Sequence, residues 1–241
     1  MQIETAQKLE FYLNSLNHIL IGAVSLYVTW YCYHFGISAY TMHVWLSILA
    51  YQLFMAEAIL ALYSTNSWSF FHALKTKRNI HWIIQIFATL FAIVGTICVY
   101  WGRPTHFMTV HSVTGLISLI LVVIVAINGL PALWSFEFGK WSRIHPVYLK
   151  LFHNLIGIFA FIIGMVSLYY GYLYTYFVES DEKDISPWLI GVLFVTTIFS
   201  LFGALKSLRT QCQTAHRLGF RLFNEQNRDY QAQLKNKESF S

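Results

Sequence analysis

The sequence has little charge for its length. Only 11% of its 241 residues are Asp, Glu, Lys or Arg, while 56% are hydrophobic. About a quarter of the residues are charged in an average soluble domain. The mean hydropathy is +0.51. A soluble globular core is therefore excluded, and we expect an integral membrane protein.

Cysteine, proline and linker-like segments are also scarce. The three cysteines, Cys32, Cys98 and Cys212, lie in separate segments without CxxC spacing, so neither a disulfide framework nor a zinc site is indicated. The four prolines and 13 glycines form no repeat or low-complexity stretch that would divide the chain. We expect one transmembrane domain over residues 1–205 and a basic cytoplasmic tail over residues 206–241.

Six stretches are long and apolar enough to cross the hydrocarbon core, which takes about 20 residues of helix. They cover residues 16–35, 43–63, 81–101, 110–130, 151–177 and 188–205. The first lacks the small-residue cleavage site of a signal peptide, so we expect a retained helix. The predicted fold is an all-α, polytopic membrane protein with six transmembrane helices.

Lys and Arg are distributed very unevenly over the predicted loops. With both termini in the cytoplasm, all but two of the 16 Lys and Arg residues, Arg103 and Lys183, fall on the cytoplasmic side. Short cytoplasmic loops concentrate positive charge in this way. The outer loop with Lys183 is otherwise acidic, through Glu179, Asp181 and Glu182. The net charge of +5 follows from topology and contact with membrane lipid, and it requires no nucleic-acid partner.

Four histidines stand at the beginnings of four successive spans. His43 opens the second span, His81 the third, His111 the fourth and His153 the fifth. A polar ring is costly in hydrocarbon and usually marks a functional position. Because alternate spans run in opposite directions, His43 and His111 form an outer pair, while His81 and His153 form an inner pair near the cytoplasm.

Two facing imidazoles on neighbouring helices can take both axial positions of one haem iron. The outer and inner pairs therefore predict two b-type haems, held by a four-helix core of the second to fifth spans. Filled axial positions indicate electron transfer rather than oxygen binding. Each histidine alone is readily explained as an interfacial polar residue. The four together begin successive spans and fall into two pairs on opposite sides of the membrane, which favours their role as haem ligands. The closely spaced histidine clusters of membrane di-iron enzymes are missing.

Other polar residues lie near the two predicted sites. Lys77, Arg78 and Lys150 belong to the basic cytoplasmic face beside the inner pair, where they would stabilise haem propionates or an anionic reductant. Glu57, the one acidic residue within a predicted span, should face the bundle interior, either as an anchor for a neighbouring helix or as a proton relay. Of the remaining six histidines, which lack partners of matching depth, His106 could reach the outer haem edge from its loop.

The sequence resembles the cytochrome b561 family of ascorbate-dependent transmembrane di-haem reductases, and in particular its short, domain-containing branch. The resemblance covers the six-helix region. It rests on the segments MHVWLSILAYQLFMAEAIL, HWIIQIFATLFAIVG, HFMTVHSVTGL and LKLFHNLIGIFAFIIGMVSL. It implies that His43, His81, His111 and His153 are the haem ligands, in the two pairs described above.

The resemblance further implies a reaction. Cytoplasmic ascorbate would be the electron donor, bound through the positional counterparts Lys77, Arg78 and Lys150, and monodehydroascorbate or a ferric chelate would be the acceptor, with His106 on the outer side. A homodimer in an endomembrane, of the endoplasmic reticulum or a vesicle, is implied rather than a plasma-membrane protein. Two other readings stay open: a haem-binding subunit of a partner oxidoreductase without its own small-molecule substrate, and a non-redox transporter or scaffold.

Overall fold

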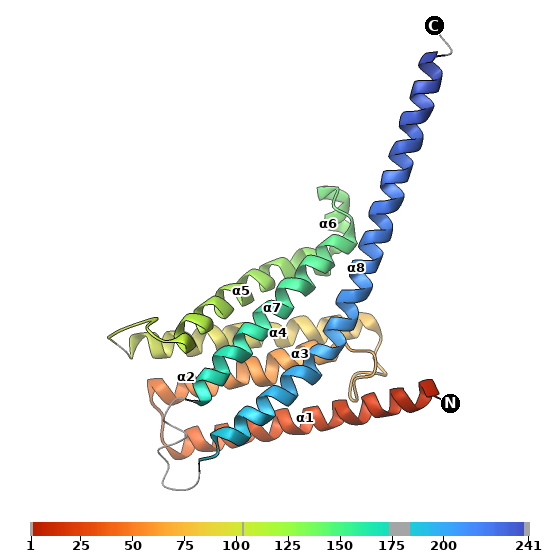
Figure 1. Ribbon diagram of the computed structural model, residues 1–241. Helices are drawn as coiled ribbons and strands as arrows, with labels where there is room; N and C mark the ends of the chain where they lie inside the picture. The colour runs from red at the N-terminus through yellow and green to blue at the C-terminus, as the bar shows by residue number, and fades with distance from the viewer. Residues whose placement is uncertain (1, 103, 174–183, 239–241) are drawn as a thin grey trace.

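The computed structural model describes residues 2–102, 104–173 and 184–238 (Figure 1). All regular structure in these ranges is helical, and six of the helical segments are long and apolar enough to cross a membrane. This confirms the predicted all-α, six-span fold. Arg103 and the outer loop with Lys183 lie outside the described residues.

The spans are formed as follows. The first is α1 (Gln2–His34), and the second joins α2 (Ala39–Ile48), the π-helical segment η1 (Leu49–Met55) and α3 (Ala56–Ala61) into one rod. The others are α4 (Leu74–Trp101), α5 (Val110–Leu133), α7 (Pro146–Tyr172) and α8 (Ser186–Glu238), with the short α6 (Ser135–Ser142) between α5 and α7. Several helices start well before the predicted spans, so His81 lies about two turns inside α4 rather than at its first residue.

Capping boxes begin the two helices that carry the outer pair. Ser38 Oγ accepts a hydrogen bond from the Thr41 amide at 3.1 Å, and Thr41 Oγ1 accepts one from the Ser38 amide at 2.8 Å. Thr109 and Ser112 exchange the same two bonds before α5. Such reciprocal bonds satisfy amides that would otherwise lack partners at a helix start. They fix the beginning of α2 at Ala39, shortly before His43, and that of α5 at Val110, directly before His111.

The second span is interrupted by a π-helical segment at its middle. Within η1, Tyr51 and Gln52 are buried, and the Tyr172 hydroxyl of α7 donates to Gln52 Oε1 at 2.6 Å. A π-helical segment changes the direction of the side chains around it and is frequent at functional positions. Here it turns two polar side chains into the bundle between the levels of the outer and inner pairs.

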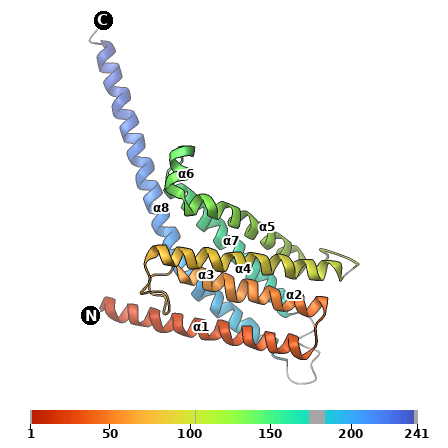
Figure 2. The same cartoon turned by 180° about the vertical axis from the view of Figure 1, so that it is seen from behind.

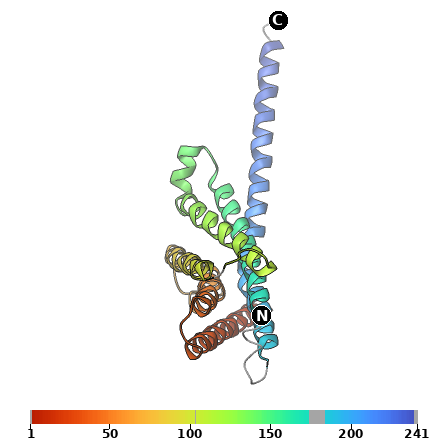
Figure 3. The same cartoon turned by 90° about the vertical axis from the view of Figure 1, so that its left-hand side faces the viewer.

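The connections divide between the two ends of the bundle (Figures 1 and 2). The N-terminal end of α1, the α3–α4 connection, α6 and the extension of α8 lie at one end, and the α1–α2 and α4–α5 connections lie at the other. Figure 3 shows α8 running past the bundle as a single helix. The positive-inside prediction places the first end in the cytoplasm, because it carries Lys75, Lys140 and the basic residues of α8.

Candidate haem centres

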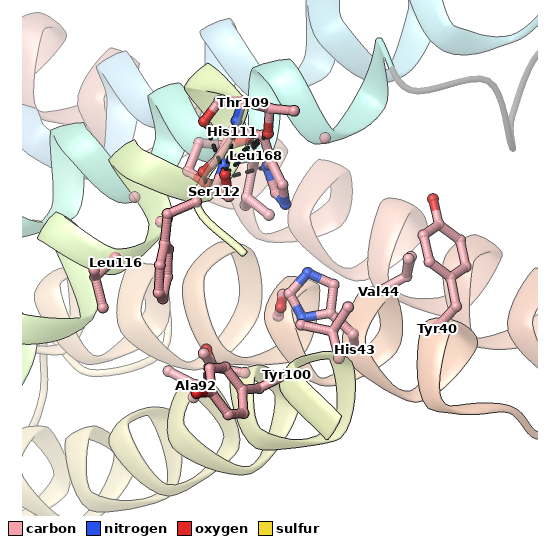
Figure 4. Close-up of a pocket in the computed structure, with 18 of the residues that line it drawn as sticks. Tyr40, His43, Val44, Ala92, Tyr100, Thr109, His111, Ser112, Leu116 and Leu168 are labelled. Carbon is pink, nitrogen blue, oxygen red and sulfur yellow. Dashed lines mark hydrogen bonds between the residues drawn. The ribbon is translucent and has the colours of Figure 1, made fainter. Parts of the chain in front are cut away.

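The outer pair lines a pocket enclosed by α2, α4, α5 and α7 (Figure 4). The ring centroids of His43 and His111 are 5.8 Å apart, and the ring planes lie at 79° to each other. His43 Nδ1 is 3.0 Å from the Gly95 carbonyl oxygen, and His111 Nδ1 is 2.8 Å from that of Ser167. Because a carbonyl oxygen only accepts, both Nδ1 atoms carry the proton. In this tautomer the lone pair lies on Nε2, the nitrogen through which each ring would coordinate a metal ion.

The inner pair repeats this arrangement at the other end of the bundle. The ring centroids of His81 and His153 are 6.3 Å apart, with the planes at 84°. His81 Nδ1 donates to the Ala58 carbonyl oxygen at 2.8 Å. His153 Nδ1 is buried and has no hydrogen-bond partner among the described residues. Backbone carbonyls of neighbouring helices therefore orient both rings of the outer pair and the His81 ring of the inner pair.

Both pairs have the spacing that an iron between them requires. A bond from an imidazole nitrogen to a first-row metal is about 2 Å long, so two rings on opposite sides of one ion have centroids about 6 Å apart. The observed 5.8 and 6.3 Å agree with this. Among the described residues, no group of three or more His, Cys, Asp or Glu converges as a metal site. Each site thus offers two protein ligands, the number that haem iron takes from a bis-histidine protein.

Two antiparallel helix pairs hold the four candidate ligands. The rod of α2, η1 and α3 runs against α4, so that His43 bonds to Gly95 while His81 bonds to Ala58. Each haem pair combines one histidine from this helix pair with one from α5 and α7. Residues 81 and 95 are about 21 Å apart along α4, at about 1.5 Å per residue. The two sites therefore lie at clearly different depths in the bundle.

Small residues leave room beside the ligand rings. A methyl group at Gly171 would lie 3.2 Å from His111 Cε1, and one at Gly129 would lie 3.4 Å from His153 Cε1. The helices α4 and α5 are also the spans least covered by the rest of the chain. In the most apolar stretch of each, 17% of the residues are buried, compared with 56% in the span of residues 39–61. The uncovered side chains of α4 and α5 are largely apolar, through residues such as Phe87, Leu90, Ile120 and Ile124.

The wall of the outer pocket includes the residue predicted for the outer site. The His106 ring stacks on Tyr100 of α4, with centroids 4.0 Å apart and planes at 14°. Both rings line the pocket that contains His43 and His111, together with Tyr40, Tyr51, Phe107, Met108 and Tyr172. The structure thus brings His106 into the same cavity as the outer pair.

The three basic candidates near the inner pair differ in their surroundings. Lys77 is buried, and its ammonium group donates to the Tyr63 carbonyl oxygen at 2.9 Å, just after the end of α3. Arg78 is half-buried, and its Nε has no hydrogen-bond partner among the described residues. Lys150 is exposed on the first turn of α7. The Lys77 ammonium group therefore binds a carbonyl of the chain itself, whereas Arg78 and Lys150 have N–H groups that can donate to another molecule.

Glu57 has a partner that the sequence analysis missed. Its Oε1 lies 2.6 Å from Nδ1 of His18 on α1, a histidine that lacked a match in the predicted pairing. This contact agrees with the predicted inward orientation and with an anchoring role between α1 and α3. A signal was present in the sequence, because an acidic side chain in a span needs a partner and His18 is a histidine in the N-terminal half of the first span.

Comparisons with known proteins agree with this geometry. Residues 42–179 match the family model described as eukaryotic cytochrome b561. The human transmembrane reductase CYB561D2 is 28% identical over 164 residues, which cover 66% of this chain and 71% of the relative. The mouse probable transmembrane reductase CYB561D1 is 30% identical over 158 residues, covering 64% and 67%. No solved structure matches. The matched family segment contains both histidine pairs.

Proposed function

The chain belongs to the eukaryotic cytochrome b561 family, and from this we propose a di-haem reductase that carries electrons from cytoplasmic ascorbate to monodehydroascorbate or a ferric chelate across the membrane. Membership makes the chain a haem-binding transmembrane reductase, related to proteins named as such. The observation that carries the proposal is the presence of two imidazole pairs, with centroids 5.8 and 6.3 Å apart, at opposite ends of one helical bundle.

When bound, the two haem b groups supply one-electron carriers at two depths of the membrane. His43 and His111 would hold one, and His81 and His153 the other. The carbonyls of Gly95, Ser167 and Ala58 keep these rings in the tautomer that coordinates iron. Two histidines at each iron leave no position for oxygen, which favours electron transfer.

We place the donor site at the cytoplasmic end, beside Arg78 and Lys150. Ascorbate is an anion at neutral pH, and fixed cationic donors attract and orient such a ligand. Arg78 lies three residues before His81, and Lys150 three before His153, so both stand close to their ligands on a helix face. Lys77 contributes indirectly, because its bond to the Tyr63 carbonyl holds the α3–α4 connection in place.

We place the acceptor site at the mouth of the outer pocket. His106 and Tyr100 form a stacked wall there, and an imidazole can donate to an oxygen of monodehydroascorbate or of a chelate. We propose that this membrane is an endomembrane. We also propose a homodimer, in which the part of α8 that extends beyond its own bundle would be available to contact a second copy of the chain.

The test is electron transfer by the purified chain in sealed vesicles that contain a ferric chelate. Ascorbate added outside should reduce the haem absorption bands and then the enclosed chelate, whereas vesicles without protein should stay oxidised. Variants His81→Ala and His111→Ala should each stop reduction of the enclosed chelate. Bound haem that ascorbate does not reduce would contradict the proposal and favour a subunit of a partner oxidoreductase.

A further inference from the structure

A hydrogen-bonded cluster outside the candidate haem ligands joins α1 to the first turn of α3 and to the α3–α4 connection. Both ring nitrogens of His18 lie 2.6 Å from oxygen atoms, Nδ1 from Glu57 Oε1 and Nε2 from Asn66 Oδ1. Glu57 Oε2 accepts a further bond from Trp68 Nε1 at 3.2 Å. The side chains of His18 and Glu57 are 16% and 18% exposed, so the cluster is mostly withdrawn from solvent but retains an accessible edge.

The surrounding bonds determine how the His18 ring must be protonated. The Ser69 hydroxyl donates to the Ala61 carbonyl oxygen at 2.9 Å, so it can only accept from Asn66 Nδ2, at 2.7 Å. This turns the carbonyl oxygen of Asn66 towards His18, and His18 Nε2 must therefore donate. A proton must also lie between Nδ1 and the carboxylate, because two lone pairs would repel each other at 2.6 Å.

The pair of His18 and Glu57 thus holds one proton more than a neutral imidazole beside a carboxylate. With that proton the pair is neutral overall, as imidazolium with carboxylate or as imidazole with carboxylic acid. Without it, the pair carries one negative charge in a poorly solvated position, which is costly. Loss of the proton would also break the contact between α1 and α3.

The pair stands directly beside the inner site. Glu57 precedes Ala58 in the chain, and the Ala58 carbonyl accepts the Nδ1 proton of His81 at 2.8 Å. Consecutive Cα atoms are about 3.8 Å apart, so a charge change at Glu57 occurs next to the backbone group that orients the ligand. A charge interacts strongly with a second charge at such range in a poorly solvated protein interior.

The other charged groups around the pair are already compensated. On α1 and α8, Glu10 and Lys206 form an ion pair at 2.6 Å, and the Tyr63 hydroxyl donates to Glu10 at 2.7 Å. On α4, the Lys77 ammonium group lies on the Tyr63 carbonyl. Within the described part of the chain, the proton shared by His18 and Glu57 is therefore the exchangeable one that stands next to the inner site.

We propose that His18 and Glu57 form a proton-binding site linked to the electron at the inner pair. With the inner site oxidised, the positive charge there would offset the deprotonated, singly negative pair. One electron arriving at the inner site is then accompanied by one proton taken from cytoplasmic water, which gives the protonated, neutral pair described above and leaves the net charge of this region unchanged. When the electron leaves for the outer site, the proton returns to the water. This inference rests on the proposed function, since it requires a redox group at His81 and His153.

The experiment is a redox titration of the purified, haem-loaded chain at several pH values, with His111→Ala protein used to identify the inner haem. One proton per electron lowers the inner midpoint potential by up to about 59 mV per pH unit, the equivalent of a tenfold change in binding. Glu57→Gln should reduce the dependence of the inner midpoint potential on pH. Glu10→Gln removes a carboxylate from the same end of the bundle and should leave that dependence unchanged.

Two further measurements cover the case in which Glu57→Gln does not fold. Trp68→Phe keeps an aromatic ring but removes the donor to Glu57, so it should displace the profile along the pH axis. The infrared difference spectrum of reduced minus oxidised wild type should contain a carboxyl band that shifts in Trp68→Phe, unlike the bands of the haem propionates. The inference alone would be overturned if the midpoint potential of the inner haem in the wild type did not depend on pH. It would also be overturned if the dependence of that potential on pH were the same in wild type, Glu57→Gln and Trp68→Phe. A chain without haem would overturn the proposed function as well.

Discussion

The imidazole of His111 on α5 is held by the backbone of α7, through a 2.8 Å hydrogen bond from its Nδ1 to the Ser167 carbonyl oxygen. The Ser167 hydroxyl adds a bond to the His111 carbonyl oxygen at 3.0 Å. The position of the outer ligand therefore depends on how closely α5 and α7 pack. Small residues at this contact should therefore affect haem binding at the outer site.

Gly171→Ala should weaken the outer haem site. The added methyl group would lie 3.2 Å from Cε1 and 3.4 Å from Nδ1 of His111, which forces the ring or α7 to move. Overpacking of this kind costs about 1–3 kcal/mol, so we expect a loss of about fivefold or more in haem affinity at the outer site. Haem titration of the apoprotein measures it. Gly22→Ala, with no atom within 4 Å of the added group, is the matched control and should bind normally.

Arg78→Gln and Lys150→Gln should raise the ascorbate concentration needed for half-maximal haem reduction. A hydrogen bond to a charged group contributes about 1.5–3 kcal/mol, so a roughly tenfold increase is expected if Arg78 contacts ascorbate directly. Stopped-flow reduction at varied ascorbate concentration measures it. Unchanged half-saturation in both variants would remove these residues from the donor site.

Lys77→Met should behave differently from those two variants. It leaves the Tyr63 carbonyl without the donor that now lies 2.9 Å away, and an unsatisfied buried carbonyl costs about 1–3 kcal/mol. We expect a lower thermal unfolding temperature in detergent. The ascorbate concentration needed for half-maximal haem reduction should change little in the protein that is folded. A large change in half-saturation at normal stability would instead place Lys77 at the ascorbate site.

His106→Phe should affect only the outer side. Phenylalanine keeps the stacking on Tyr100 but removes the imidazole nitrogens, which would bind the proposed acceptor. Haem content and reduction by ascorbate should stay normal, while reduction of an enclosed ferric chelate should slow several-fold. An equal rate in wild type and variant would show that the acceptor binds elsewhere.

Much of this arrangement follows from the sequence alone. Runs of apolar residues predict six spans because the bilayer sets their length, and six helical segments in the described part of the chain meet that requirement. The pairing of His43 with His111, and of His81 with His153, follows from helix direction alone. The rings do lie 5.8 and 6.3 Å apart in these pairs. Their identity as haem ligands stays a prediction.

Other features depend on tertiary contacts that no periodicity reveals. The sequence does not distinguish Lys77 from Arg78 and Lys150, since all three are basic, but the Lys77 side chain turns inward to a carbonyl 14 residues away in the chain. His18 has no histidine partner of matching depth in the sequence, and its partner in the structure is Glu57. The π-helical segment at Tyr51 and Gln52 also reads as ordinary helix in the sequence.

The most direct test of the two-pair model is haem quantification in double variants. His81→Ala with His153→Ala removes both ligands of one predicted site, so one haem per chain should remain. His81→Ala with His111→Ala removes one ligand from each site, so both haems should be lost. Two haems in the wild type with this pattern would establish the pairing. A wild type without haem, or one haem retained in the second double variant and none in the first, would contradict it.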